Sequence, residues 1–331
     1  MNELTLEFTL TAIAVFLLTV VAERILIPVL RSHKLGQKIL DIGPRWHKSK
    51  EGTPIMGGLG FILGSLVASA GFFILHAVRG DAQNYIPLAL TLAFAVGNGL
   101  IGFVDDYCKL IKKQNEGLTW KQKLLLQLAI AGAYLCVMRY TGNLDTSVAL
   151  PFSDRSVELG WSFYPIAVLV LAGVVNGGNI TDGIDGLASS VTFVIGGFFA
   201  VWAFTIRNHQ LGFLSAILLG ATLGFLIYNF HPARVFMGDT GSLFLGAMVI
   251  GSAFLAGEEI AGLVICTVFI FEMFSSLLQV VWFKLTHGKR LFRMAPFHHH
   301  LEQCSWNEYQ IVGFFSALEV LFCVVAWFAV R

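Results

Sequence analysis

The sequence predicts an all-α integral membrane protein with about ten transmembrane helices. First, 56% of its 331 residues are hydrophobic and only 13% are charged. Its mean hydropathy of +0.73 is far above that of an ordinary soluble domain. Second, about ten mostly apolar runs approach the roughly 20 residues that a helix needs to cross a bilayer. Third, Lys and Arg gather in alternate connections between these runs.

The apolar runs predict the individual helices in order. The first run should be a retained helix and not a cleaved signal peptide, because Glu3 and Glu7 precede it in place of a basic segment. The predicted spans are approximately residues 5–30, 55–78, 85–104, 124–140, 161–178, 187–206, 211–230, 240–257, 260–283 and 311–330.

The basic residues predict the orientation of these helices. Sixteen Lys and Arg residues lie in alternate connections, namely 31–52, 105–123, 229–239 and 284–309, against five on the other side. Basic connections stay in the cytoplasm. We therefore expect both termini outside the cell.

The rest of the organisation is simple. The outer connection 141–160 contains alternating segments, which favour a small β-hairpin on the outer surface near 144–162. We find no linker, so residues 1–331 should form one domain. The five cysteines are scattered and indicate no disulfide framework. The net charge of +1 argues against a nucleic-acid partner.

The segment NGGNITDGIDGL, residues 176–187, holds two carboxylates between uncharged runs. Bare carboxylates near lipid are costly unless water, a cation or a basic ligand meets them. Asp182 and Asp185 are therefore candidate site residues. The plain alternative is a polar loop that joins two membrane helices.

Two further inner segments carry charged residues. In GFVDDYCKL, Asp105 and Asp106 are adjacent, and Lys109 would share a helical face with Asp105. Adjacent acids suit a divalent cation, although a solvated helix end would look the same. In HKSKEGTPIMGG, residues 47–58, Lys48 is a candidate phosphate partner or only a topology signal.

Asp239 lies in FMGDTGS, where the eighth run begins, so it is a candidate ligand or a simple N-cap. Five aspartates thus fall on one side of the membrane. Hard oxygen ligands near a phosphorylated substrate indicate Mg²⁺. The aspartates are Asp105, Asp106, Asp182, Asp185 and Asp239.

The last inner connection contains three consecutive histidines in APFHHHLE. A zinc site made by all three is disfavoured, because consecutive side chains do not face one ion. The histidines are better suited to donating hydrogen bonds to an anionic diphosphate than to binding zinc. Glu272, inside the ninth run, is a functional candidate or a packing residue.

Together these segments resemble the polyprenyl-phosphate N-acetylhexosamine-1-phosphate transferase superfamily. The resemblance covers almost the whole chain, since GTPIMGG, DDYCK, NGGNITDGIDGLA, FMGDTGS and APFHHHLE occur in family order. The HHHLE ending points to the phospho-N-acetylmuramoyl-pentapeptide transferase branch. One departure is Gly177, where the family more often has Ala after the Asn.

The resemblance implies Mg²⁺-dependent transfer of phospho-MurNAc-pentapeptide from UDP to undecaprenyl phosphate, which yields lipid I and UMP. It implies catalytic roles for Lys48, Asp105, Asp106, Asp239 and His298. It implies metal contacts by Asn179, Asp182 and Asp239. The substrate-binding positions that it implies are Lys121, Asn179, Asp182, Asp185, Asn229, Phe236, Met237, Gln279, His299 and His300.

The resemblance also implies a bacterial plasma-membrane enzyme with a cytoplasmic active site, and a homodimer. Two alternatives remain open on the sequence. One is a UDP-GlcNAc-1-phosphate transferase of the same superfamily. The other is a secondary transporter, although transporters place polar residues near the bilayer midplane and not at one surface.

Overall fold

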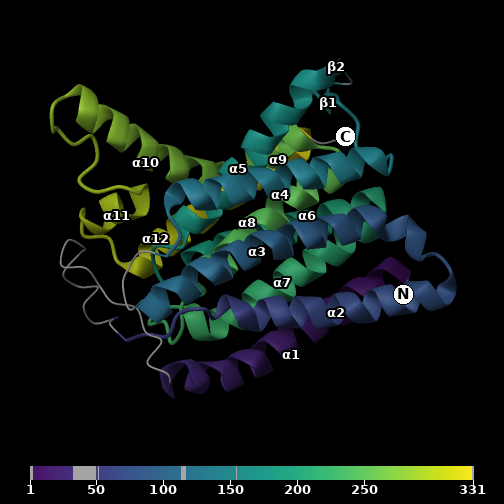
Figure 1. Ribbon diagram of the computed structural model, residues 1–331, viewed down its shortest axis with the longest axis horizontal. Helices are drawn as coiled ribbons and strands as arrows, with labels where there is room; N and C mark the ends of the chain where they lie inside the picture. The colour runs from purple at the N-terminus through teal and green to yellow at the C-terminus, as the bar shows by residue number, and fades with distance from the viewer. Residues whose placement is uncertain (1–2, 33–49, 51, 113–116, 154, 330–331) are drawn as a thin grey trace.

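A computed structural model describes residues 3–32, 50, 52–112, 117–153 and 155–329 (Figure 1). Ten of its helices are long and apolar enough to cross a membrane, which confirms the predicted fold class. They are α1 (Glu3–Ser32), α2 (Gly58–Arg79), α3 (Ile86–Lys112), α4 (Trp120–Tyr140), α5 (Phe163–Thr181), α6 (Leu187–Ile206), α7 (His209–Asn229), α8 (Gly238–Leu255), α10 (Thr267–Leu285) and α12 (Glu308–Ala329). The short helices are η2 (Ala82–Tyr85), η3 (Gly160–Ser162), α9 (Glu259–Ile265) and α11 (Phe297–Glu302).

Helix α8 forms the centre of the bundle, packed against α2, α3 and α5. Nearly all of its side chains are buried, and many are glycine, alanine or serine. In lipid, small residues let helix backbones approach closely and replace the hydrophobic drive that water supplies to soluble proteins. The most buried helix therefore begins with Gly238 and Asp239, directly at the candidate site.

The two ends of the bundle differ. Helices α3 and α5 end, and α8 begins, at the end near α11, whereas α1 begins and α12 ends toward the opposite end (Figure 1). The predicted hairpin is confirmed at that opposite end, where β1 (Ser147–Ala149) pairs antiparallel with β2 (Ser156–Glu158). The candidate site and the hairpin are thus separated by the length of the bundle.

The ninth apolar run differs from the single helix predicted over 260–283. The chain breaks at Cys266, so α9 stays against α8 and α12 while α10 leans away from the bundle (Figure 1). A new helix start leaves backbone donors without partners. The carboxylate of buried Glu319 of α12 lies close to one of them, the N–H of Val268. This carboxylate lies far along the chain, so the apolar run itself gives no sign of the break.

Gly177 lies inside α5 and not in a turn. A side chain there would reach within 2.6 Å of the carbonyl oxygen of Phe269 in α10. The missing Cβ therefore allows close packing of α5 on α10.

Candidate functional site

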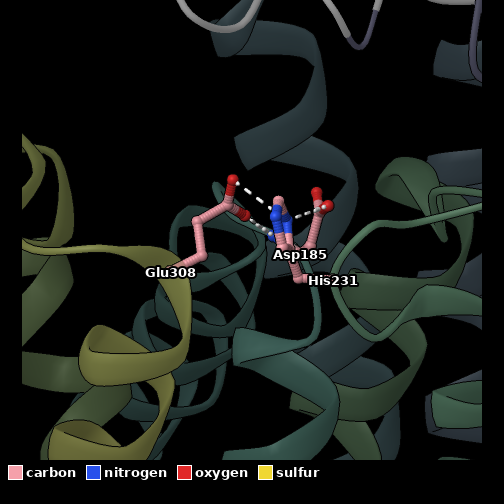
Figure 2. A group of neighbouring side chains, drawn as sticks. All are labelled: Asp185, His231 and Glu308. Atoms are coloured by element: carbon pink, nitrogen blue, oxygen red, sulfur yellow. Dashed lines mark hydrogen bonds and ion pairs between the residues drawn. The ribbon is translucent and has the colours of Figure 1, made fainter.

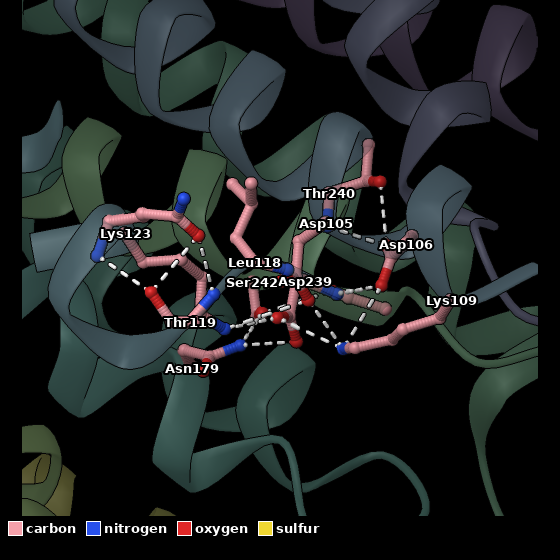
Figure 3. A network of polar contacts seen from close by, with 12 residues as sticks. Asp105, Asp106, Lys109, Leu118, Thr119, Lys123, Asn179, Asp239, Thr240 and Ser242 are labelled. Carbon is pink, nitrogen blue, oxygen red and sulfur yellow. Dashed lines mark hydrogen bonds and ion pairs between the residues drawn. The ribbon is translucent and has the colours of Figure 1, made fainter. Parts of the chain in front are cut away.

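Three carboxylates meet where α3 ends and α8 begins (Figure 3). Asp105 and Asp106 are almost completely buried in the last turns of α3, and Asp239 lies in the first turn of α8. One oxygen from each lies within 4.8 Å of the others. Three carboxylates at this spacing repel one another strongly unless positive charge lies among them.

Two lysines supply positive charge to this cluster. Lys109 Nζ lies 2.6 Å from Asp105 Oδ2 and 3.2 Å from Asp239 Oδ2. Lys123 Nζ of α4 lies 2.6 Å from the same Asp239 oxygen and 3.6 Å from Asp105 Oδ2. The expected Asp105–Lys109 pair on one helical face is present. Lys123 was not among the residues predicted from the sequence.

Backbone hydrogen bonds fix the orientation of the two α3 aspartates. Asp106 accepts the N–H of Thr240 at 2.9 Å and its hydroxyl at 2.7 Å, so a side chain of α3 caps the start of α8. The sequence left open that Asp239 was a simple N-cap of α8, but Asp106 of α3 fills this role. Asp105 Oδ1 accepts the N–H of Leu118 at 2.7 Å, which fastens the segment before α4.

The end of α5 completes the cluster. Asn179 Nδ2 donates to Asp239 Oδ1 at 3.0 Å and to the Ser242 hydroxyl at 2.8 Å. Asp182 follows directly after α5. Burial and the negative charges of Asp239 and Asp106 raise the pKa of Asp182 well above its usual value. Asp182 therefore shares the electrostatic field of the three carboxylates.

This arrangement fits a magnesium ion. Asp105, Asp106 and Asp239 offer hard, anionic oxygen donors within one small volume, and Mg²⁺ prefers one or two protein carboxylates together with substrate phosphates. Asp182 and Asn179 lie at its edge as further polar groups.

A second charged cluster brings together Asp185, His231 and Glu308 (Figure 2). Asp185 Oδ2 accepts from His231 Nδ1 at 3.0 Å, and Asp185 Oδ1 lies 2.7 Å from Lys50 Nζ. Lys50 Nζ also lies 2.8 Å from Glu308 of α12. Asp185, His231 and Glu308 could together hold a cation, and Lys50 lies between the two carboxylates.

The histidines of α11 have separate partners. His298 is completely buried, and its Nδ1 lies 3.0 Å from Glu272 Oε2 of α10. His298 Nε2 is buried with no hydrogen-bond partner among the described residues. It faces Gly183, where a Cβ would come within 2.1 Å of it. His299 pairs with Glu302 at 2.5 Å, and His300 Nδ1 accepts the N–H of Arg293.

Four other predicted positions make contacts within the protein. Asn229 is buried, accepts the N–H of Gly186 and donates to the carbonyl of Val235. Gln279 accepts the N–H groups of Leu291 and Phe292 and so holds the loop after α10. The Met237 side chain is buried, whereas Phe236 is partly exposed beside it.

Of the two predicted lysines, only one can be placed, and it lies apart from the clusters. Lys48 falls outside the described residues. Lys121 is exposed, with its Nζ 5.6 Å from the ring centre of Trp120. Among the described lysines, Lys50, Lys109 and Lys123 reach the clusters, and Lys50 and Lys123 each lie two residues after a predicted lysine. A signal for Lys123 was present, because Lys123 and Gln127 are polar residues at i and i+4 in an apolar run.

Comparisons with known proteins agree on one family. A family model described as glycosyl transferase family 4 matches residues 88–257. The phospho-N-acetylmuramoyl-pentapeptide-transferase of Halalkalibacterium halodurans is 41% identical over 317 residues, 96% of this chain and 95% of the relative. The transferase of the same name from Bacillus subtilis is 41% identical, over 94% of both chains. That from Caldicellulosiruptor bescii is 41% identical, over 98% of this chain and 97% of the relative.

Proposed function

Because the chain belongs to glycosyl transferase family 4, with full-length phospho-N-acetylmuramoyl-pentapeptide-transferase relatives, we propose that it catalyses their reaction. The proposed reaction transfers phospho-MurNAc-pentapeptide from its UDP carrier to undecaprenyl phosphate. The products are lipid I and UMP. The proposed setting is the bacterial plasma membrane, with the site at the cytoplasmic surface.

The observation that carries this proposal is the meeting of Asp105, Asp106 and Asp239 with two lysines at one end of the bundle. Phosphoryl transfer needs little covalent help from protein and depends on positioning and on neutralising charge. A bound Mg²⁺ would be held by these aspartates and would polarise the phosphoryl oxygens of the diphosphate.

The two lysines have a direct task in this reaction. Their ammonium groups lie within 3.2 Å of the same oxygen of Asp239. A substrate diphosphate beside Asp239 would therefore receive hydrogen bonds from both. Asn179 holds the other Asp239 oxygen, so the carboxylate keeps one orientation while substrate binds.

Asp105 is suited to receiving the lipid phosphate. Leu118 N–H binds its Oδ1, while its Oδ2 faces Lys109 and the cluster. A phosphate monoester loses its second proton at a pKa of about 6, so it is largely ionised near neutral pH. We therefore assign Asp105 to placing the attacking phosphate as much as to removing its proton, with direct attack on the diphosphate.

The nucleotide would bind on the side of Asp182, Asp185 and the α11 histidines. Lys50 neutralises Asp185, and buried His298 is directed at the turn between those two aspartates. Phe236 is partly exposed and offers a ring for the base. The apolar lipid tail would lie along bundle surface that is exposed to the bilayer.

A turnover assay with two donors tests the proposal. Purified protein receives Mg²⁺, undecaprenyl phosphate and either UDP-MurNAc-pentapeptide or UDP-GlcNAc, and released UMP is measured. We expect UMP from the first donor only. UMP from UDP-GlcNAc alone would instead assign the GlcNAc-1-phosphate branch, and no UMP from either donor would contradict a transferase of this class.

The transporter alternative has less support. The charged clusters lie at the ends of α3, α5 and α12 and not in broken helices at the midplane. We also propose a homodimer. Its support is general, since small residues permit close contact between membrane helices.

A further inference from the structure

A hydrogen bond between α4 and α5 lies next to the site but has no role in the chemistry above. Asn176 Nδ2 of α5 donates to Gln127 Oε1 of α4 at 2.7 Å, and also to the carbonyl of Ala172 in its own helix. Gln127 is 1% exposed. A buried amide in a membrane helix is costly, so this pair calls for a physical reason.

The two amides stand on the helix faces that carry site residues. Gln127 lies four residues after Lys123 on α4, and Asn176 lies three residues before Asn179 on α5. Residues at these spacings share a helical face. The two site residues then meet on one carboxylate, Lys123 at Asp239 Oδ2 and Asn179 at Asp239 Oδ1. Helices α4 and α5 are therefore joined twice, once directly and once through Asp239.

The first turns of α4 have few apolar side chains packed against the bundle. Leu124, Leu125 and Leu126 are exposed, the last two by 69% and 44%, so much of this helix surface is available to lipid. For apolar side chains that face lipid, the free energy differs little between one helix register and another. A hydrogen bond to a polar partner, in contrast, forms in one register only. The bond from Leu118 N–H to Asp105 fastens the segment just before α4. Lys123 lies between that anchor and Gln127.

We propose that Asn176 and Gln127 are positioning residues that set the rotation and register of α4 so that Lys123 reaches Asp239. A slip of one helical turn would move Lys123 by about 5.4 Å, beyond hydrogen-bond reach of Asp239. A rotation by one residue would turn it about 100° away. The proposal rests on the proposed function only where it concerns turnover, because the placement of Lys123 can be measured without substrate.

The experiment measures how fast Lys123 is acylated in the full-length protein in detergent. Wild type, Gln127→Met and Asn176→Leu are treated briefly with an N-hydroxysuccinimide acetate reagent, and each lysine is quantified by mass spectrometry. Exposed Lys121 serves as the internal standard. We expect Lys123 to be protected in wild type and to react several-fold faster in both variants. UMP release should fall on the order of 10- to 100-fold, as expected for a misplaced catalytic group.

The matched control removes another buried bond of α4. Tyr134→Phe deletes the hydrogen bond from Tyr134 to Thr91 of α3, toward the opposite end of the bundle. In Tyr134→Phe, Lys123 should stay protected and turnover should stay within about twofold of wild type. This control therefore separates the positioning of Lys123 from general stability. If Lys123 stays protected from acylation in both Gln127→Met and Asn176→Leu, the proposal is wrong. This conclusion would hold at any thermal unfolding temperature of the two variants. If Lys123 becomes reactive but wild type releases no UMP, the positioning role stands and the proposed function fails.

Discussion

At the scale of single residues, Asp239 is the group on which the site converges. Two ammonium groups and one amide contact its two oxygens. Asp239→Asn keeps the shape but removes the charge, so we expect turnover to fall on the order of 10³-fold, as for a lost transition-state contact. UMP release and the thermal unfolding temperature are measured together. Asp145→Asn, on an exposed side chain near the hairpin, is the control. Near-normal turnover in Asp239→Asn would remove this residue from the centre of the site.

Lys123 and Lys121 give a sharper comparison, because they are two residues apart on α4. Lys123 contacts Asp239, whereas Lys121 points to solvent beside Trp120. Lys123→Met should reduce turnover about 10²-fold, since a fixed cation near the diphosphate is lost. Lys121→Met should stay within about threefold, a typical result for an exposed charge. The reverse order in the UMP assay would mean that the substrate is bound by the outer lysine.

The choice between these lysines shows where sequence reasoning stops at this scale. The residues on one segment, Asp105, Asp106 and Lys109, can be related to one another by helical spacing alone. Helical spacing does not give the rotation of α4 relative to α3, because this rotation depends on the residue at which α4 begins. Thr119 and Gln122 form a capping box that fixes this start.

At the scale of elements, the turn after α5 is shaped by α11. A methyl group at Gly183 would lie 2.1 Å from His298 Nε2, and Glu272 holds that ring from the other side. Gly183→Ala must therefore displace the turn or the histidine. We expect at least a tenfold loss of turnover from the altered geometry.

Gly197→Ala in α6 is the matched control for Gly183→Ala, since its added methyl group meets nothing within 4 Å. Alanine also favours the helix by up to about 1 kcal/mol. Its turnover and unfolding temperature should not fall. Equal turnover in both variants would show that the His298 contact has no importance for the reaction.

The helices themselves were predictable because hydropathy reports each span locally. All ten predicted runs correspond to long helices. The break at Cys266 was not predictable in this way, because the carboxylate beside the new helix start belongs to Glu319, more than fifty positions further on. The contacts of His298 with Glu272 and Gly183 likewise depend on tertiary packing. Local signals thus define the elements, and long-range contacts define the site.

At the scale of the whole molecule, the two ends of the bundle should face different compartments. The connections at the site end carry most of the Lys and Arg residues, whereas the hairpin lies at the other end. In a variant without the five native cysteines, Ser156→Cys should react with an impermeant maleimide in intact spheroplasts. Lys289→Cys should react only after lysis. The opposite pattern would place the site outside the cell.

The central claim is that Asp105 and Asp106 of α3 and Asp239 of α8 hold one divalent cation at the end of the bundle. The most direct test is a crystal structure grown with Mn²⁺ in place of Mg²⁺, with anomalous diffraction recorded at the manganese edge. We expect an anomalous peak at these three carboxylates and its loss in Asp239→Asn. A peak that lies elsewhere, for example between Asp185, His231 and Glu308, with none at the three aspartates would contradict it.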